Sequence, residues 1–178
     1  MRYILVLAGD SHRPCGTLGP NTLKRCKAAL WYARKLSESG ESVTFILAAG
    51  CGEMIEPNDT VAMQMRAWFR KRSRSFQYLT NEQDYQVCRT LGEMRWTARA
   101  FGETAPTGLA IVSTSRHLRR VEIIRRWFVP LPPFTRILSS EAPPPWWHEM
   151  LGYVKLIACY GYFELPVEKL RRRYYRIS

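Results

Sequence analysis

The sequence AIVSTSRHLRRVEII, residues Ala110–Ile124, predicts a strand, a short polar turn and a helix in succession. The apolar residues Leu109–Val112 fit a strand buried on both faces, and Ser113–Ser115 form the turn. The helix that follows is expected to end at Phe128. Because its first N–H groups have no partner within the helix and its dipole is positive there, the helix start favours a bound anion.

Two polar side chains of this helix are expected to point inward. At about 100° per residue, its apolar stripe consists of Leu118, Val121, Ile124 and Phe128. His117 lies near the middle of that stripe and Arg120 at its flank, whereas Arg119 lies on the opposite, solvent face. An inward His is often a hydrogen-bonded structural residue. An inward Arg one turn away also requires a partner, and this favours a ligand site.

The length and apolar content bound the class of protein. The chain has 178 residues, enough for one domain with a sizeable core. No segment approaches the roughly 20 apolar residues of a membrane span, and MRYILVLAGD at the N-terminus shows no cleavable signal pattern. We therefore expect one cytoplasmic domain, residues 1–178, with its core at about 3–140 and closing helices at about 146–175.

Strands and helices are expected to alternate along the chain. The predicted strands are Tyr3–Ala8, Val43–Ala48, Phe76–Leu79, Leu109–Val112 and Phe134–Leu138. The other predicted helices run from a cap at Asn21 or Thr22 to Ser39, and over Val61–Lys71, Tyr85–Phe101, Trp146–Tyr160 and Leu165–Tyr175. This alternation predicts an α/β fold with one doubly wound, mainly parallel five-stranded sheet, helices on both faces and a C-terminal helical extension.

In such sheets ligands bind beyond the carboxyl ends of the strands. The polar side chains that the sequence can project there are Asp10, Arg25, Thr90, Glu93, His117 and Arg120, and the backbone of Gly9, Gly50, Ser113 and Thr114 lies beside them. On the third helix Thr90 lies beside the apolar stripe and Glu93 further round. We expect His117 to act as a general acid or base or as an anion ligand, with Glu93 or Asp10 orienting it or a water molecule. Arg25 and Arg120 would hold the anion.

The net charge of +12 gives a second hypothesis. It concentrates in Arg66–Arg74, Arg116–Arg126 and Lys169–Arg176. Solvated helix faces and a basic tail would explain it, but so would attraction to nucleic acid, an acidic lipid surface or a phosphorylated ligand. Four aromatic residues lie among these Arg residues: Trp68, Trp127, Tyr174 and Tyr175. The alternative to a small-molecule site is therefore a basic nucleic-acid-binding protein without catalysis.

The five cysteines are an odd, scattered set without a C-x-x-C pair, so no disulfide framework is predicted. Cys26, Cys88 and Cys159 are interpreted as small core residues. A metal site could in principle form from Cys15, Cys51, Asp10, His12 and Glu53. Their spacing matches no known zinc pattern, and we predict reduced cysteines and no structural metal.

Several short motifs follow one another over about residues 3–125. They are Arg25 with Ala29, the strand end Ile46–Gly50, Ala62 with Met65, Thr90, and the segment Val112–Arg120 with the sequence VSTSRHLRR. In these motifs the chain resembles the YdcF/SanA/ElyC-like family, a Rossmann-like family of bacterial proteins, and the last segment is the most specific. Two positions depart from the family: Val61 stands where its Ser-Glu-Ala has Glu, and Gly92-Glu93 replaces its Glu-Asn.

The resemblance implies a Rossmann-like fold with a small-molecule site. Many members carry an N-terminal membrane helix and act in the cell envelope; since this chain lacks such a helix, we expect no envelope role. One member binds S-adenosylmethionine, which makes that molecule a candidate cofactor. We expect a protein that binds a nucleotide-like or phosphorylated molecule, compatible with hydrolase or transferase activity. No nucleophile–base pair and no G-x-S-x-G motif occur in the sequence, so covalent catalysis is not predicted.

Overall fold

The computed structural model describes residues 1–9, 17–49, 60–81, 90–101, 108–142 and 145–158. The chain divides into two compact units, Met1–Ala142 and Pro143–Ser178. In the second unit the described element is a helix, α5 (Trp146–Ala158), as predicted for the start of the C-terminal extension. Within the described ranges, no helix has the length and apolar character needed to cross a membrane.

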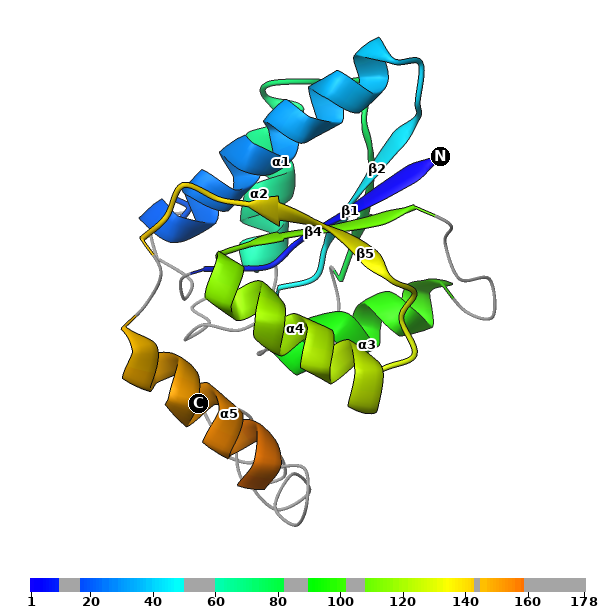
Figure 1. Cartoon of the computed structure of the whole chain (residues 1–178). Coiled ribbons are helices and arrows are strands. Elements are labelled where there is room, and N and C mark those ends of the chain that lie inside the picture. The colour runs from blue at the N-terminus through cyan, green and yellow to red at the C-terminus, as the bar shows by residue number, and fades with distance from the viewer. Residues whose placement is uncertain (10–16, 50–59, 82–89, 102–107, 143–144, 159–178) are drawn as a thin grey trace, which may run out of the picture. The chain divides into compact units, whose positions relative to one another are not determined.

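The first unit is built on a five-stranded sheet. Its strands are β1 (Arg2–Val6), β2 (Val43–Leu47), β3 (Gln77–Thr80), β4 (Leu109–Ser113) and β5 (Phe134–Leu138). They lie in the order β3-β2-β1-β4-β5, and each neighbouring pair is parallel (Figure 1). The predicted doubly wound α/β sheet is therefore confirmed, and it is parallel throughout.

Four helices cover the two faces of this sheet. The first pair is α1 (Pro20–Glu38) and α2 (Val61–Arg70), and the second is α3 (Thr90–Phe101) and α4 (Ser115–Trp127). The two pairs lie on opposite faces (Figure 1). Successive side chains of each strand lie on opposite faces of the sheet. On one face, Ile4, Phe45 and Ala110 belong to the core cluster that includes residues of α1 and α2. The remaining alternate residues are also buried, because β1, β2 and β4 are continuous apolar runs.

The start of α1 differs from the prediction. Neither Asn21 nor Thr22 caps the helix; Gly19 is the N-cap residue, without a side-chain hydrogen bond, and Pro20 follows it. Proline suits the first helical position because its fixed φ matches a helix and its missing N–H would have no partner there. Instead of capping the helix, the Thr22 hydroxyl accepts a hydrogen bond from the N–H of Gly9 (3.0 Å), and this bond connects α1 to the end of β1.

Other helix limits agree with the prediction to within one residue where the structure describes them. The helix α1 ends at Glu38, one residue before the predicted end at Ser39; Gly40, with φ of +80°, closes it, and the Gly40 N–H donates to the Ser37 carbonyl (3.0 Å). The described part of α3 begins at Thr90, so the predicted start at Tyr85 lies outside the described residues, as does the predicted helix Leu165–Tyr175.

Candidate polar site at the carboxyl edge of the sheet

The strand order places a switch point between β1 and β4. The chain leaves β1 toward α1 on one face and leaves β4 toward α4 on the other. At such a point the two connections diverge, and doubly wound folds bind ligands in the crevice between them. The residues that follow the two strands there, Ala8 and Gly9 after β1 and Thr114 after β4, are the backbone of the candidate site.

His117 is fixed between two hydroxyl groups in the first turn of α4. Thr114 is the N-cap of this helix, and its side chain accepts from the His117 N–H (3.3 Å). The ring Nδ1 lies 2.8 Å from Ser113 Oγ, and Nε2 lies 2.8 Å from Thr90 Oγ1. A neutral imidazole donates through one nitrogen and accepts through the other, so both contacts are satisfied at once.

The imidazole of His117 is neutral at physiological pH. Burial, followed by the positive charges of Arg120 and Arg25, holds the pKa of His117 well below its usual 6.5. An imidazolium that binds an anion by charge is therefore not favoured at this position. A neutral imidazole in contact with a hydroxyl is instead the arrangement of a general base. The sequence contained no recognisable nucleophile–base pair, whereas the structure brings two hydroxyls within hydrogen-bonding distance of one imidazole.

Glu93 is buried on α3 and faces the end of β1. Its Oε1 accepts from the N–H of Ala8 (3.3 Å), and Glu93 is buried although the helical period placed it further round from the apolar stripe. Burial raises the pKa of the Glu93 carboxyl to about 8, although the Ala8 N–H and the charge of Arg25 lower it in part. At pH 7 this carboxyl is mostly protonated, so it can donate a hydrogen bond as well as accept one.

Arg25 is buried on α1 and bound to the end of β1. Its Nη1 donates to the carbonyls of Leu7 (3.2 Å) and Ala8 (2.8 Å). Its Nε donates to Oε1 of Glu141 (2.6 Å), which also accepts from the hydroxyl of Ser139 (3.1 Å). Nε and Nη1 thus contact groups of the protein itself, and the ion pair joins α1 to the segment after β5.

Two residues of this edge were missed in the sequence. Glu141, three residues after the end of the fifth predicted strand, is the buried partner of Arg25. Asn81, at the end of β3, accepts from the N–H of Ala49 through Oδ1 (3.2 Å) and holds the end of β2. The only sequence signal for either is a polar residue shortly after a predicted strand, and many surface residues share that signal.

The predicted site residues converge where the structure describes them. Gly9, Arg25, Thr90, Glu93, Ser113, Thr114 and His117 lie around the ends of β1 and β4, joined by the contacts above. Arg120, half-buried on α4, acts electrostatically on His117. Asp10 and Gly50 lie outside the described residues.

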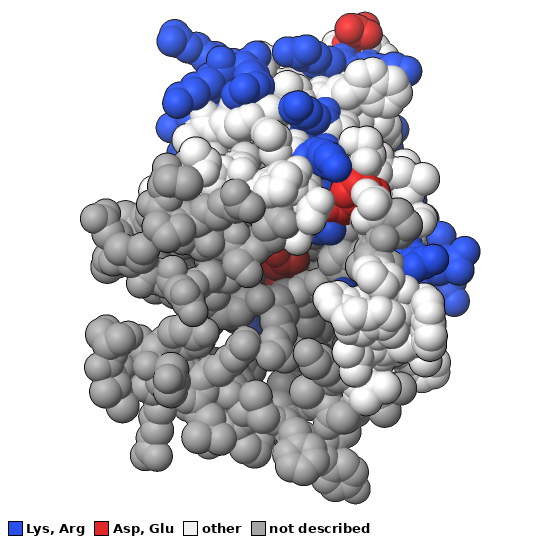
Figure 2. All heavy atoms as spheres, turned by 90° about the vertical axis from the view of Figure 1, so that its left-hand side faces the viewer, with Lys and Arg blue, Asp and Glu red and all other residues white. Residues whose placement is uncertain are grey.

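Three ionisable side chains at this edge carry no unbalanced charge. Arg25 is paired with Glu141, Glu93 is mostly protonated at pH 7, and His117 is neutral. The carboxyl ends of the strands lie at the left of Figure 1, on the side that Figure 2 presents. Described Lys and Arg side chains predominate over Asp and Glu on that face (Figure 2). Basic side chains on a face attract anions.

Metal coordination finds no support among the described residues, which contain no cluster of three His, Cys, Asp or Glu able to hold an ion. The candidate metal ligands Cys15, Cys51, Asp10, His12 and Glu53 lie outside the described ranges. Cys26 is buried in the core, as predicted, and burial raises the pKa of its thiol, which keeps it protonated.

Comparison with known proteins yields no relative: no family model matches the chain, and no curated protein or solved structure is similar enough to match it. The function is therefore inferred from the residues at the sheet edge and from the motifs in the sequence.

Proposed function

We propose that this protein binds an anionic small molecule, nucleotide-like or phosphorylated, at the carboxyl edge between β1 and β4. The observation that carries the proposal is a group of polar side chains at the switch point: His117, Glu93 and Ser113 are buried, and Thr90 beside them is half-buried. Polar groups of this kind are costly to bury, and here they gather where the fold places ligands. The resemblance to the YdcF-like family in Val112–Arg120 supports the same location.

Two features of the group define how an anion would be held. The start of α4 supplies a positive helix end, and Arg120 supplies a full charge one turn away. The backbone of Gly9 approaches α1 closely: a Cβ added to Gly9 would lie 2.8 Å from Asn21 Cβ. A ligand at this edge therefore meets the backbone of two tightly joined segments, a preorganised surface that lowers the cost of binding.

The same residues are suited to proton transfer. His117 is a neutral base in contact with the hydroxyl of Thr90, and Glu93 is a protonated acid at pH 7. An acid and a base with such different pKa values can remove one proton and supply another in hydrolysis or group transfer. A hydrolase or transferase acting on the bound molecule is the enzymatic form of the proposal. In the non-enzymatic form, the same contacts only bind it.

The ligand class can be tested with ATP, glucose 6-phosphate and S-adenosylmethionine in a thermal-shift screen followed by calorimetry, with glucose as the uncharged control. We expect the phosphorylated molecules to raise the melting temperature and glucose to have no effect. Their affinity should decline above pH 8, because ionised Glu93 repels an anion. S-adenosylmethionine carries a sulfonium cation, so tighter binding at high pH would indicate that ligand instead. If neither ATP nor glucose 6-phosphate binds, the proposal of an anionic ligand is wrong.

A further inference from the structure

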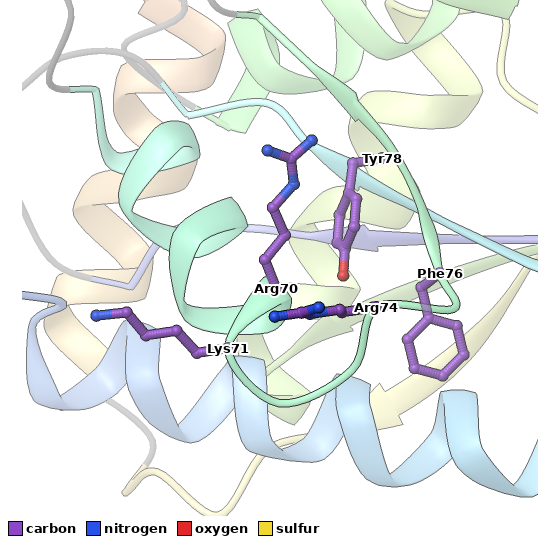
Figure 3. A pocket seen from close by; sticks show the side chains of 5 residues that line it. All are labelled: Arg70, Lys71, Arg74, Phe76 and Tyr78. Atoms are coloured by element: carbon purple, nitrogen blue, oxygen red, sulfur yellow. The ribbon is translucent and has the colours of Figure 1, made fainter.

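A second recess lies at the opposite edge of the sheet. The chain runs along α2 from the carboxyl edge to the amino edge and then turns into β3. At this turn Arg70, Lys71, Arg74, Phe76 and Tyr78 line a recess of about 450 Å³ (Figure 3). Volumes of this order are typical of small-molecule sites. The recess is distant along the strands from the candidate site, so it represents a separate feature of the molecule.

Three basic residues line this recess. Arg70, Lys71 and Arg74 are exposed, and within the described residues their side chains make no hydrogen bond or ion pair. Cations near a helix C-terminus are stabilised by the helix dipole, which accounts in part for Arg70 and Lys71. Arg74, however, lies beyond the helix end, so the dipole gives little reason for a third cation here.

Aromatic rings form the other wall, and they are held in place. The Tyr78 ring stacks on Phe45 (centroids 5.9 Å apart), and its hydroxyl donates to the Ser73 carbonyl (3.2 Å). Phe76 packs edge-on against Phe45 (5.3 Å). In Figure 3 the guanidinium of Arg70 lies beside the Tyr78 ring, and Arg74 passes near its hydroxyl end. Two guanidinium groups thus flank a fixed and half-exposed aromatic ring.

We propose that this recess binds a nucleoside phosphate, either a free nucleotide or part of a single-stranded nucleic acid. Arg70 and Arg74 contact the phosphate through their planar donor groups, with Lys71 at the rim. The base lies against Tyr78, as bases lie on aromatic side chains in single-strand-binding proteins. A lone oxyanion would fill only a small part of the recess and leave the aromatic wall uncovered.

The test measures AMP binding by calorimetry and binding of a fluorescent oligo(dT) by anisotropy. The double variant Arg70→Gln/Arg74→Gln is compared with Arg119→Gln/Arg136→Gln, which removes the same charge from exposed positions on α4 and β5. Loss of two phosphate contacts should weaken binding at least tenfold, and the control should stay within twofold of the original protein. For the oligonucleotide, the plot of log affinity against log salt concentration has a negative slope, and its magnitude should be smaller by about 1.4 in the Arg70→Gln/Arg74→Gln variant, which loses two phosphate contacts. Circular dichroism checks that both variants fold.

Three further comparisons decide the ligand and the location. AMP should bind more tightly than ribose 5-phosphate, because only AMP presents a base to Tyr78. If the affinity rises with oligonucleotide length, the ligand is a nucleic-acid strand. If the affinity is independent of length, the ligand is a free nucleotide. Because AMP is also a candidate ligand of the site proposed above, each variant is also made together with Arg120→Ala, which weakens that site and leaves the recess intact, so the AMP binding that remains reports on the recess. Three outcomes would overturn the proposal. The Arg70→Gln/Arg74→Gln variant and its control lose affinity equally, ribose 5-phosphate binds as tightly as AMP, or neither AMP nor the oligonucleotide binds.

Discussion

Replacing Glu93 with Gln tests whether a protonated carboxyl lies at the end of β1. The amide keeps the shape of the side chain, and its oxygen can still accept from the N–H of Ala8. It cannot ionise. In the original protein the folded state binds the Glu93 proton more tightly than the unfolded state, so the free energy of unfolding should fall as the pH rises from 4.5 to about 8.

The size of this effect follows from the pKa difference. One pKa unit corresponds to about 1.4 kcal/mol, so raising the pKa from 4.5 to about 8 corresponds to about 5 kcal/mol once the carboxyl is fully ionised. At pH 7 the penalty is about 3 kcal/mol. Glu93→Gln should therefore match the original protein near pH 4.5 and exceed its stability by several kcal/mol at pH 9.

Urea unfolding followed by circular dichroism from pH 5 to pH 9 measures this difference. Burial of neutral His117 also costs stability below pH 6.5, but that effect is common to both proteins and cancels in the comparison. Glu38→Gln, at an exposed position of α1, is the control and should show no pH-dependent gain. If Glu93→Gln and the original protein differ by the same amount at every pH, Glu93 is ionised when folded and the reasoning is refuted.

Three substitutions test the contacts that hold the site. Glu141→Gln leaves the buried Arg25 without its ion-pair partner and should cost about 3–5 kcal/mol in urea unfolding; a loss under about 1 kcal/mol would show that the pair contributes little. Thr114→Ala removes the cap of α4 and should cost about 1 kcal/mol in the same assay. An unchanged free energy of unfolding would show that the hydroxyl does not stabilise the helix start. Gly9→Ala places a Cβ 2.8 Å from Asn21 Cβ and should cost about 1–3 kcal/mol, and an unchanged melting temperature would contradict the close packing there.

The fold could be predicted because its main signals are local. β1, β2 and β4 are apolar runs without polar alternation, so they are stable only when buried on both faces of a sheet covered by helices. The start of α1 could not be fixed in the same way. Asn21 and Thr22 both have capping side chains, but Thr22 is used by the distant Gly9, and Pro20 begins the helix.

The site could be predicted only in part, for a related reason. The helical period identified His117 as an inward residue, and the sheet topology implied that Arg25 would reach the same edge. The partner of Arg25 is 116 residues away, in a segment whose position depends on how β5 packs. The same limit applied to Glu93, whose burial depends on the close approach of α3 to the end of β1.

The most direct test of the proposed anion site is the effect of Arg120→Ala on ligand affinity. Calorimetry at pH 7 with glucose 6-phosphate, which has no base for the recess beside α2, should show a loss of tenfold to a hundredfold for this variant, because a charge-assisted contact contributes about 1.5–3 kcal/mol. Arg119→Ala, at the neighbouring solvent-exposed position, should bind within twofold of the original protein. If Arg120→Ala destabilises the protein but leaves affinity per folded molecule unchanged, or if both variants lose affinity equally, the anion does not bind at this edge.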